Sequence, residues 1–253
     1  MDSIPSILNQ FKNKQVLIIG DAMIDAYMWG NIHRMSPEAP VPVVEIEKRE
    51  SRLGGAANVA LNIQSLGATP VLFSAIGKDH YGDVFSMLME KQKLSCEGIQ
   101  RLSDRNTTVK TRIISDNKHV LRVDEESTKP IIEHFIATEL ETLIRSKKFD
   151  VIIFEDYNKG LLTETLIKKA IQIAKELKIP TIVDPKKDNF FAYKGVDVFK
   201  PNLKEIKEGL SVEFNVLSET ELSENVRLVL EKLNAKSVLL TLSEHGIYFQ
   251  SKT

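Results

Sequence analysis

The sequence predicts an α/β protein, a three-layer α/β/α sandwich built on a mostly parallel sheet with a small inserted β lid. Two observations support this prediction. Short apolar runs alternate with longer segments of helical period along most of the 253 residues, a pattern typical of a parallel sheet covered by helices on both faces. Two stretches, residues 26–52 and 107–124, interrupt this alternation with strand-like patterns that lack helical period.

The predicted strands of the main sheet are short continuous apolar runs, as expected for strands buried on both faces. In chain order they cover residues 16–19, 71–73, 151–154, 181–183 and 238–240. The segments between them have apolar residues three and four apart and are predicted to be helices. These helices cover residues 57–66, 84–91, 132–144, 163–177 and 221–233, and Gly67 and Pro180 mark two of the helix ends.

The two interrupting stretches contain alternating apolar and polar residues, for example at 43–47 and 109–113, which predict exposed or half-buried strands. Ligands of open α/β folds bind at the carboxyl edge of the sheet, so strands inserted there would form a lid over a binding site. The sequence contains no repeat, low-complexity tract or linker. We therefore interpret residues 1–253 as one folding unit with an inserted β subdomain.

Composition excludes several classes of function. Lys plus Arg number 34 and Asp plus Glu number 35, so no overall field favours nucleic acid or an anionic membrane. The single cysteine, Cys96, excludes an internal disulfide framework, and the five histidines show no spacing typical of a metal site. No apolar stretch is long enough to span a membrane. We expect a cytoplasmic protein without a nucleic-acid or membrane partner.

Paired glycines precede the predicted helix at 57–66, in the segment Leu53-Gly54-Gly55-Ala56-Ala57-Asn58. Glycines let backbone N–H groups approach a ligand closely, and a helix N-terminus favours oxygen-rich or anionic groups. A tight strand-to-helix turn would explain the same residues without any ligand. The segment matches neither the P-loop nor the dinucleotide-binding spacing.

Carboxylates and lysines follow three of the predicted strands. Asp21 and Asp25 come after the first strand, where Asp25 is the better candidate for a ligand contact and Asp21 is equally well explained as a turn or helix cap. The others follow the strands at 151–154 and 181–183, and they are Asp156, Tyr157, Lys159 and Lys186. All should meet at one edge of the sheet, although a single lysine such as Lys186 can also be a solvated surface charge.

Six segments occur in the order and spacing of a known family. They are GDAMID at 20–25, RMSPEAPVPVVEIE at 34–47, LGGAANVALNIQSLGA at 53–68, FEDYNKG at 154–160, IVDPKK at 182–187 and FKPNLKE at 199–205. With these segments the chain resembles, over nearly its whole length, the ribokinase-like (PfkB) carbohydrate kinases. SPEAPVPV, DYNKG and DPK are similar in particular to the heptose 7-phosphate kinase branch, the kinase domain of bifunctional heptose kinase/adenylyltransferases.

The resemblance implies an ATP-dependent kinase that uses Mg²⁺ and phosphorylates the anomeric hydroxyl of D-glycero-D-manno-heptose 7-phosphate to the 1,7-bisphosphate. This reaction belongs to the synthesis of ADP-heptose for lipopolysaccharide. The alternatives are a ribokinase-like kinase for another sugar or sugar phosphate, and a non-catalytic sugar-binding module. Residues expected to contact the sugar hydroxyls are Asp25, Gly54, Gly55 and Asn58.

The resemblance also assigns nucleotide and phosphate contacts. The nucleotide is expected at Asn202, Leu203, Lys204, Glu205, Thr241, Ser243 and Gly246. Glu205 would act on Mg²⁺ through water, although Asn202 and Glu205 could equally form a helix N-cap and capping box; Ser243 replaces a glycine that is usual in the family. The substrate's own phosphate is expected near Asp156, Lys159 and Lys186, with Arg112 and Arg122 on the lid.

Two further expectations concern assembly and completeness. Lid strands of this family often pair across two protomers, so Val41, Val43 and Ile46 are expected to belong to the interface of a homodimer. The family's catalytic aspartate lies in a D-x-x-G-A-G-D segment, and no such segment occurs up to Thr253. We therefore expect the catalytic residue beyond Thr253, and residues 1–253 alone to be an incomplete kinase domain without activity. Whether an adenylyltransferase domain follows is left open.

Overall fold

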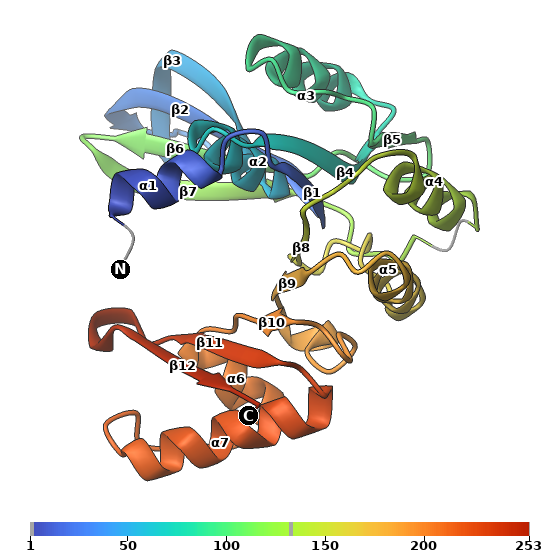
Figure 1. The fold of residues 1–253 in the computed structure, drawn as a ribbon. Coiled ribbons are helices and arrows are strands. Elements are labelled where there is room, and N and C mark those ends of the chain that lie inside the picture. Colours follow the sequence, from blue (N-terminus) through green and yellow to red (C-terminus); the bar gives the residue numbers. More distant parts are fainter. Residues whose placement is uncertain (1–2, 132–133, 253) are drawn as a thin grey trace.

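An eight-stranded, mostly parallel sheet forms the centre of the molecule, in the strand order β12-β11-β10-β9-β8-β1-β4-β5 (Figure 1). The computed structural model describes residues 3–131 and 134–252. The strands are β1 (Gln15–Gly20), β4 (Thr69–Gly77), β5 (Ile99–Leu102), β8 (Val151–Glu155), β9 (Thr181–Asp184), β10 (Val198–Phe199), β11 (Ser237–Thr241) and β12 (Ile247–Ser251). Only the pairing of β11 with β12 is antiparallel. The five predicted strands are confirmed.

Alternation along the strands divides the core into two layers, one on each face of the sheet. On β1, Leu17 and Ile19 belong to one buried cluster, whereas Val16 and Ile18 belong to the other. Both sets are apolar because both faces are covered, which explains why the strands appear in the sequence as continuous apolar runs. The predicted three-layer arrangement is therefore confirmed.

Seven α-helices occur in the described residues, and six of them bury side chains against the sheet. They are α1 (Ile4–Gln10), α2 (Ala56–Ser65), α3 (His80–Lys91), α4 (His134–Ser146), α5 (Glu164–Glu176), α6 (Leu203–Leu210) and α7 (Glu219–Leu233). Buried residues of α2 and α3 pack on one face, and those of α4, α5, α6 and α7 pack on the other. The five predicted helices are present, although residues 132–133 of the predicted fourth helix lie outside the described residues.

A second, four-stranded sheet rises from the carboxyl edge of the main sheet, in the order β3-β2-β6-β7 (Figure 1). Its strands are β2 (Ala22–Met35), β3 (Pro42–Gly55), β6 (Val109–Ser115) and β7 (Lys118–Glu125). Only Asp21 separates β1 from β2, so the second sheet must begin where β1 ends. Its strands cover most of the two stretches that interrupt the helical pattern of the sequence.

The base of the four-stranded sheet is buried against the main body. Ile24, Leu53 and Val109 lie on three neighbouring strands and belong to the same apolar cluster as α2 and α3. Burial of this base fixes the position of the side chains that follow on the same strands.

Among the described helices, none combines the length and the apolar composition that a membrane crossing requires.

Candidate active site

The paired glycines form the turn from β3 into α2. Gly55 has φ of +57°, a conformation that side chains rarely adopt, and the N–H of Ala56 donates to the carbonyl of Asp21 at 3.0 Å. A Cβ added at Gly54 would overlap the Asp25 carboxylate. The turn therefore needs glycine at both positions, and at Gly54 the reason is the approach of a candidate sugar-binding residue. Asn58 lies exposed on the first turn of α2.

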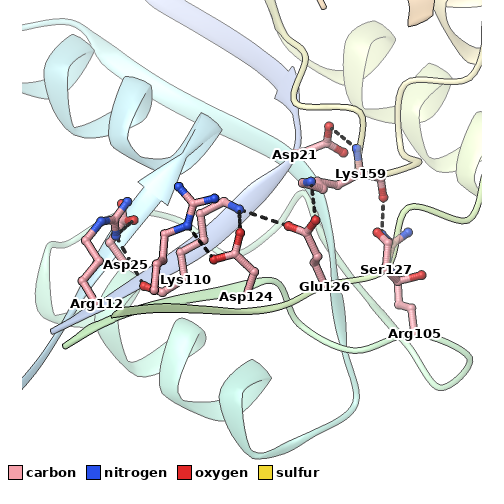
Figure 2. Close-up of polar contacts among 10 residues, drawn as sticks. Asp21, Asp25, Arg105, Lys110, Arg112, Asp124, Glu126, Ser127 and Lys159 are labelled. Carbon is pink, nitrogen blue, oxygen red and sulfur yellow. Dashed lines mark hydrogen bonds and ion pairs between the residues drawn. The ribbon is translucent and has the colours of Figure 1, made fainter. Parts of the chain in front are cut away.

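Asp25 lies near the start of β2 and forms an ion pair with Arg112 on β6. The distance from Asp25 Oδ1 to the nearest guanidinium nitrogen of Arg112 is 2.5 Å, and both side chains are half-buried (Figure 2). The guanidinium also lies 5.4 Å from the ring centroid of Tyr27. The structure thus brings together two residues that the sequence predicted to contact different parts of the substrate.

Asp21 has a structural role rather than a ligand contact. Its buried carboxylate accepts hydrogen bonds from the backbone N–H groups of Tyr157 and Lys159, each at 3.0 Å, and of Leu161 at 3.3 Å. Burial raises the pKa of this carboxyl, while the backbone donors act in the opposite direction. Asp21 therefore holds the loop after β8 against the start of β2, and of its two predicted roles the structure favours the turn.

Asp156 is buried and makes its side-chain hydrogen bonds within the protein. Its Oδ2 accepts from the hydroxyl of Tyr193 at 2.7 Å and from Nδ2 of Asn189 at 2.9 Å. Its Oδ1 accepts from the backbone N–H of Asn158 at 2.8 Å. In this structure the Asp156 oxygens hold the loop after β8, and a direct substrate contact at Asp156 stays a prediction.

A row of charged side chains connects the four-stranded sheet to that loop (Figure 2). Lys110 pairs with Asp124 at 2.9 Å and with Glu126 at 3.0 Å, and Lys159 pairs with Glu126 at 2.8 Å. Arg122 is more exposed and pairs with Asp124 at 2.9 Å. Lys159 is therefore neutralised by a carboxylate of the protein itself.

The predicted nucleotide residues, apart from Glu205, line one groove of about 1250 Å³ beside α6. The predicted residues in its wall are Asn202, Leu203, Lys204, Thr241, Ser243 and Gly246. Asn202 lies directly before α6. Ser243 and Gly246 lie after β11, so two segments that each follow a strand form the groove. Ser243 has φ of +56°, in the left-handed region that favours glycine, so the glycine that the resemblance leads one to expect there would adopt this conformation without strain.

Glu205 is buried at the N-terminus of α6. Its Oε2 accepts from the N–H of Asn202 at 2.9 Å, and Oδ1 of Asn202 accepts from the N–H of Glu205 at 2.9 Å, which completes a capping box. Oε1 of Glu205 pairs with Lys186, whose ammonium lies 5.7 Å from the ring centroid of Tyr157. Lys186 therefore lies between Glu205 and Tyr157, and its contact with the substrate's phosphate stays a prediction.

Sequence reasoning missed three charged residues at this edge, which are Glu155, Asp184 and Lys200. Lys200 pairs with Asp184 at 2.7 Å, and Glu155 is 8% exposed. Burial, followed by repulsion from Asp184, raises the pKa of Glu155 to about 7. Glu155 and Asp184 are the last residues of β8 and β9, so the rule that sites lie at the carboxyl ends of parallel strands could have found them.

Solved structures with a similar fold include two sugar kinases. Phosphofructokinase-2 from Escherichia coli, in its tetrameric inhibited form, matches with a TM-score of 0.73 and 14% identity over 95% of this chain and 77% of that chain. Ribokinase from Arabidopsis thaliana, complexed with ribose and ATP, matches with a TM-score of 0.69 and 14% identity over 95% and 75%. The chain therefore has the ribokinase-like fold.

The family follows from the sequence itself. The profile of the pfkB family of carbohydrate kinases matches residues 13–253, and the chain belongs to this family. Among curated relatives, the bifunctional protein HldE of Aliarcobacter butzleri is 40% identical over 93% of this chain and 49% of its own length. The HldE of Syntrophotalea carbinolica is 35% identical over 97% and 50%. The chain spans about half the length of these relatives.

Proposed function

We propose that the chain is the kinase part of a heptose kinase, which binds D-glycero-D-manno-heptose 7-phosphate and ATP for phosphoryl transfer to the anomeric hydroxyl. One observation carries the proposal. Asp25 and the turn at Gly54 lie at the same carboxyl edge of the main sheet as the groove beside α6, in a chain that is 35–40% identical to HldE proteins. The proposed location is the cytoplasm, which supplies ATP.

The sugar is proposed to lie between the β3–α2 turn and the four-stranded sheet. Asp25 offers carboxylate oxygens to two hydroxyls, Gly54 and Gly55 present backbone without side chains, and Asn58 can both donate and accept. In this position the four-stranded sheet acts as a lid. Asp21 contributes indirectly, because it holds the loop after β8 beside this site.

ATP is proposed to lie in the groove beside α6, with Mg²⁺ near Glu205. In this structure the ammonium of Lys186 pairs with Oε1 of Glu205, so a hydrated Mg²⁺ would take over that position from the ammonium. Within residues 3–131 and 134–252, no cluster of three or more His, Cys, Asp or Glu side chains could hold a metal ion. Mg²⁺ typically keeps several waters and binds substrate phosphates, so we propose that ATP and water supply most of its ligands. When bound, Mg²⁺ would neutralise charge on the phosphates.

The test is isothermal titration of the protein with heptose 7-phosphate, fructose 6-phosphate and ribose, with Gly54→Ala as the diagnostic variant. We expect the wild type to prefer heptose 7-phosphate, since the lid and the phosphate-binding cations suit a phosphorylated sugar. Gly54→Ala should displace the Asp25 carboxylate and weaken sugar binding by about tenfold or more, while leaving ATP affinity near wild type; a thermal melt checks that the variant folds.

Preference for fructose 6-phosphate or ribose would instead indicate a kinase for another sugar. Binding of heptose 7-phosphate without any binding of ATP would favour a sugar-binding module. Unchanged sugar affinity in Gly54→Ala would place the sugar site elsewhere.

A further inference from the structure

Arg112 contacts the sugar side of the site through Asp25. Arg112 lies opposite Tyr27 in the pairing of β2 with β6. Its guanidinium donates to Oδ1 of Asp25, which lies two residues before Tyr27 on β2. The side chains are 22% and 24% exposed, so the pair is partly shielded from water and stronger than a surface ion pair. In this state one of the Asp25 oxygens that a sugar hydroxyl would use is occupied by Arg112.

The other cations near the site are held by carboxylates without a proposed role in sugar binding. Lys159 and Lys110 share Glu126, and Lys186 pairs with Glu205. Within the described part of the chain, the only ion-pair partner of Arg112 is Asp25. If Arg112 leaves Asp25 for a new anion, a proposed sugar-binding carboxylate is released. The same exchange at the lysines would leave Asp25 unchanged.

The residue opposite Arg112 on the neighbouring strand β7 indicates where such an anion would lie. Arg112 and Arg122 are direct cross-strand partners in the β6–β7 ladder, so their side chains share one face of the sheet. Like charges directly opposite each other destabilise a strand pair. A phosphate between the two guanidinium groups would relieve this repulsion and accept charge-assisted hydrogen bonds from both.

We propose that Arg112 is a specificity-determining residue that couples recognition of the substrate's own phosphate to recognition of its hydroxyls. This inference rests on the proposed function. When a sugar phosphate enters, Arg112 leaves Asp25 for the phosphate, and the freed carboxylate accepts hydrogen bonds from the sugar hydroxyls. An unphosphorylated sugar must compete with Arg112 for Asp25 and offers no anion in exchange. The ion pair thus excludes unphosphorylated sugars by competition.

The proposal predicts opposite changes for two ligands in Arg112→Gln. By isothermal titration, affinity for heptose 7-phosphate should fall by about ten- to a hundredfold, because a charge-assisted contact is lost. Affinity for unphosphorylated heptose should rise by about three- to tenfold, because Asp25 is released from its ion pair. A simple phosphate contact would lower the first affinity and leave the second unchanged, which would overturn the proposal.

Three further arms keep the test interpretable. Arg49→Gln removes a positive charge from the other face of the same sheet and should leave both affinities unchanged, which controls for net charge. Arg112→Lys retains a charge in the strand and should lie between wild type and Arg112→Gln for both ligands. Inorganic phosphate should raise the affinity of the wild type for heptose, by linkage, and should have no such effect in Arg112→Gln.

The two proposals fail in different ways. If the wild type binds neither sugar, the proposed function is wrong. If the wild type binds heptose 7-phosphate but Arg112→Gln and Arg112→Lys bind unphosphorylated heptose no better than wild type, the coupling through Asp25 is wrong and the proposed function stands.

Discussion

At the scale of single residues, Glu155 is the side chain whose charge state departs most clearly from its usual value. It ends β8 with its carboxyl buried, beside Asp184 and near Lys200 and Lys186. Burial and the neighbouring carboxylate raise its pKa from 4.5 to about 7, against the attraction of the two lysines. Because the folded state then binds the proton more tightly than the unfolded chain, the stabilisation from Glu155 is present below pH 4.5 and is lost as the pH rises through about 7.

Glu155→Gln should remove this dependence, because glutamine has the shape of the protonated carboxyl and no charge. We expect its free energy of unfolding to exceed that of the wild type by about 1–3 kcal/mol at pH 8 and to match it near pH 4.5. Urea denaturation at both pH values measures the difference. Glu139→Gln, at an exposed position of α4, is the matched control and should show no such change. A wild type more stable than Glu155→Gln at pH 8 would contradict the assignment.

At the scale of elements, α6 begins with residues that have both a structural and a proposed binding role. The capping box uses Oδ1 of Asn202 and the carboxylate of Glu205, and it satisfies backbone N–H groups at the helix N-terminus. Asn202 also lines the groove proposed for ATP, and its side-chain NH₂ is not needed for the cap. The two roles use different atoms of one carboxamide, so they can be separated by substitution.

Asn202→Ser and Asn202→Ala should separate them. Serine can accept the hydrogen bond from Glu205, so its thermal midpoint should stay near wild type, whereas alanine should lose about 1 kcal/mol of stability. Both variants lack the NH₂ donor and should bind ATP more weakly, by about tenfold. Calorimetry with ATP and a thermal melt of each variant make the comparison. Wild-type ATP affinity in Asn202→Ser would show that Asn202 serves the helix alone.

At the scale of the whole molecule, the four-stranded sheet exposes several apolar side chains to solvent. The exposed apolar residues on its strands or their connection are Ile32, Met35, Val41, Val120, Leu121 and Val123. Leu121 and Val123 alternate with Arg122, so they lie on the face opposite the charged row. Val43 and Ile46, which the sequence analysis assigned to an interface, are half-buried within the sheet. Exposed apolar side chains on a sheet can belong to an interaction site, and an interface here stays a prediction.

We propose that the protein forms a homodimer through this sheet, and Leu121→Lys tests it. Leu121 is 54% exposed, and a charge there should raise the dissociation constant of the dimer by about tenfold or more. Light scattering over a concentration series measures this constant. Leu217→Lys, at a position 74% exposed before α7, should have no effect. A wild type that remains monomeric at all concentrations would exclude the dimer, and equal dimerisation of both variants would move the interface elsewhere.

The sequence by itself determined five of the eight strands of the main sheet, five of the seven described helices, and residues at several of their ends. Continuous apolar runs predicted the buried strands, apolar spacing predicted the helices, and Gly54, Gly55 and Asn202 were found because turns and caps depend on local backbone geometry. The family was likewise visible in short segments whose order is preserved along the chain. These properties depend on neighbours within a few residues, and for that reason a linear pattern reveals them.

Only the tertiary structure decided which charges meet. Asp25 and Arg112 are 87 positions apart, and Asp156 reaches Tyr193 across 37. Strand register and loop packing join these pairs, and no local pattern encodes them. The sequence predicted substrate contacts at Asp156, Lys159 and Lys186, which stay predictions. The structure adds that Asp156 is buried and that the two lysines pair with Glu126 and Glu205. A charge takes the partner that folding brings within a few ångströms, because unpaired burial is costly.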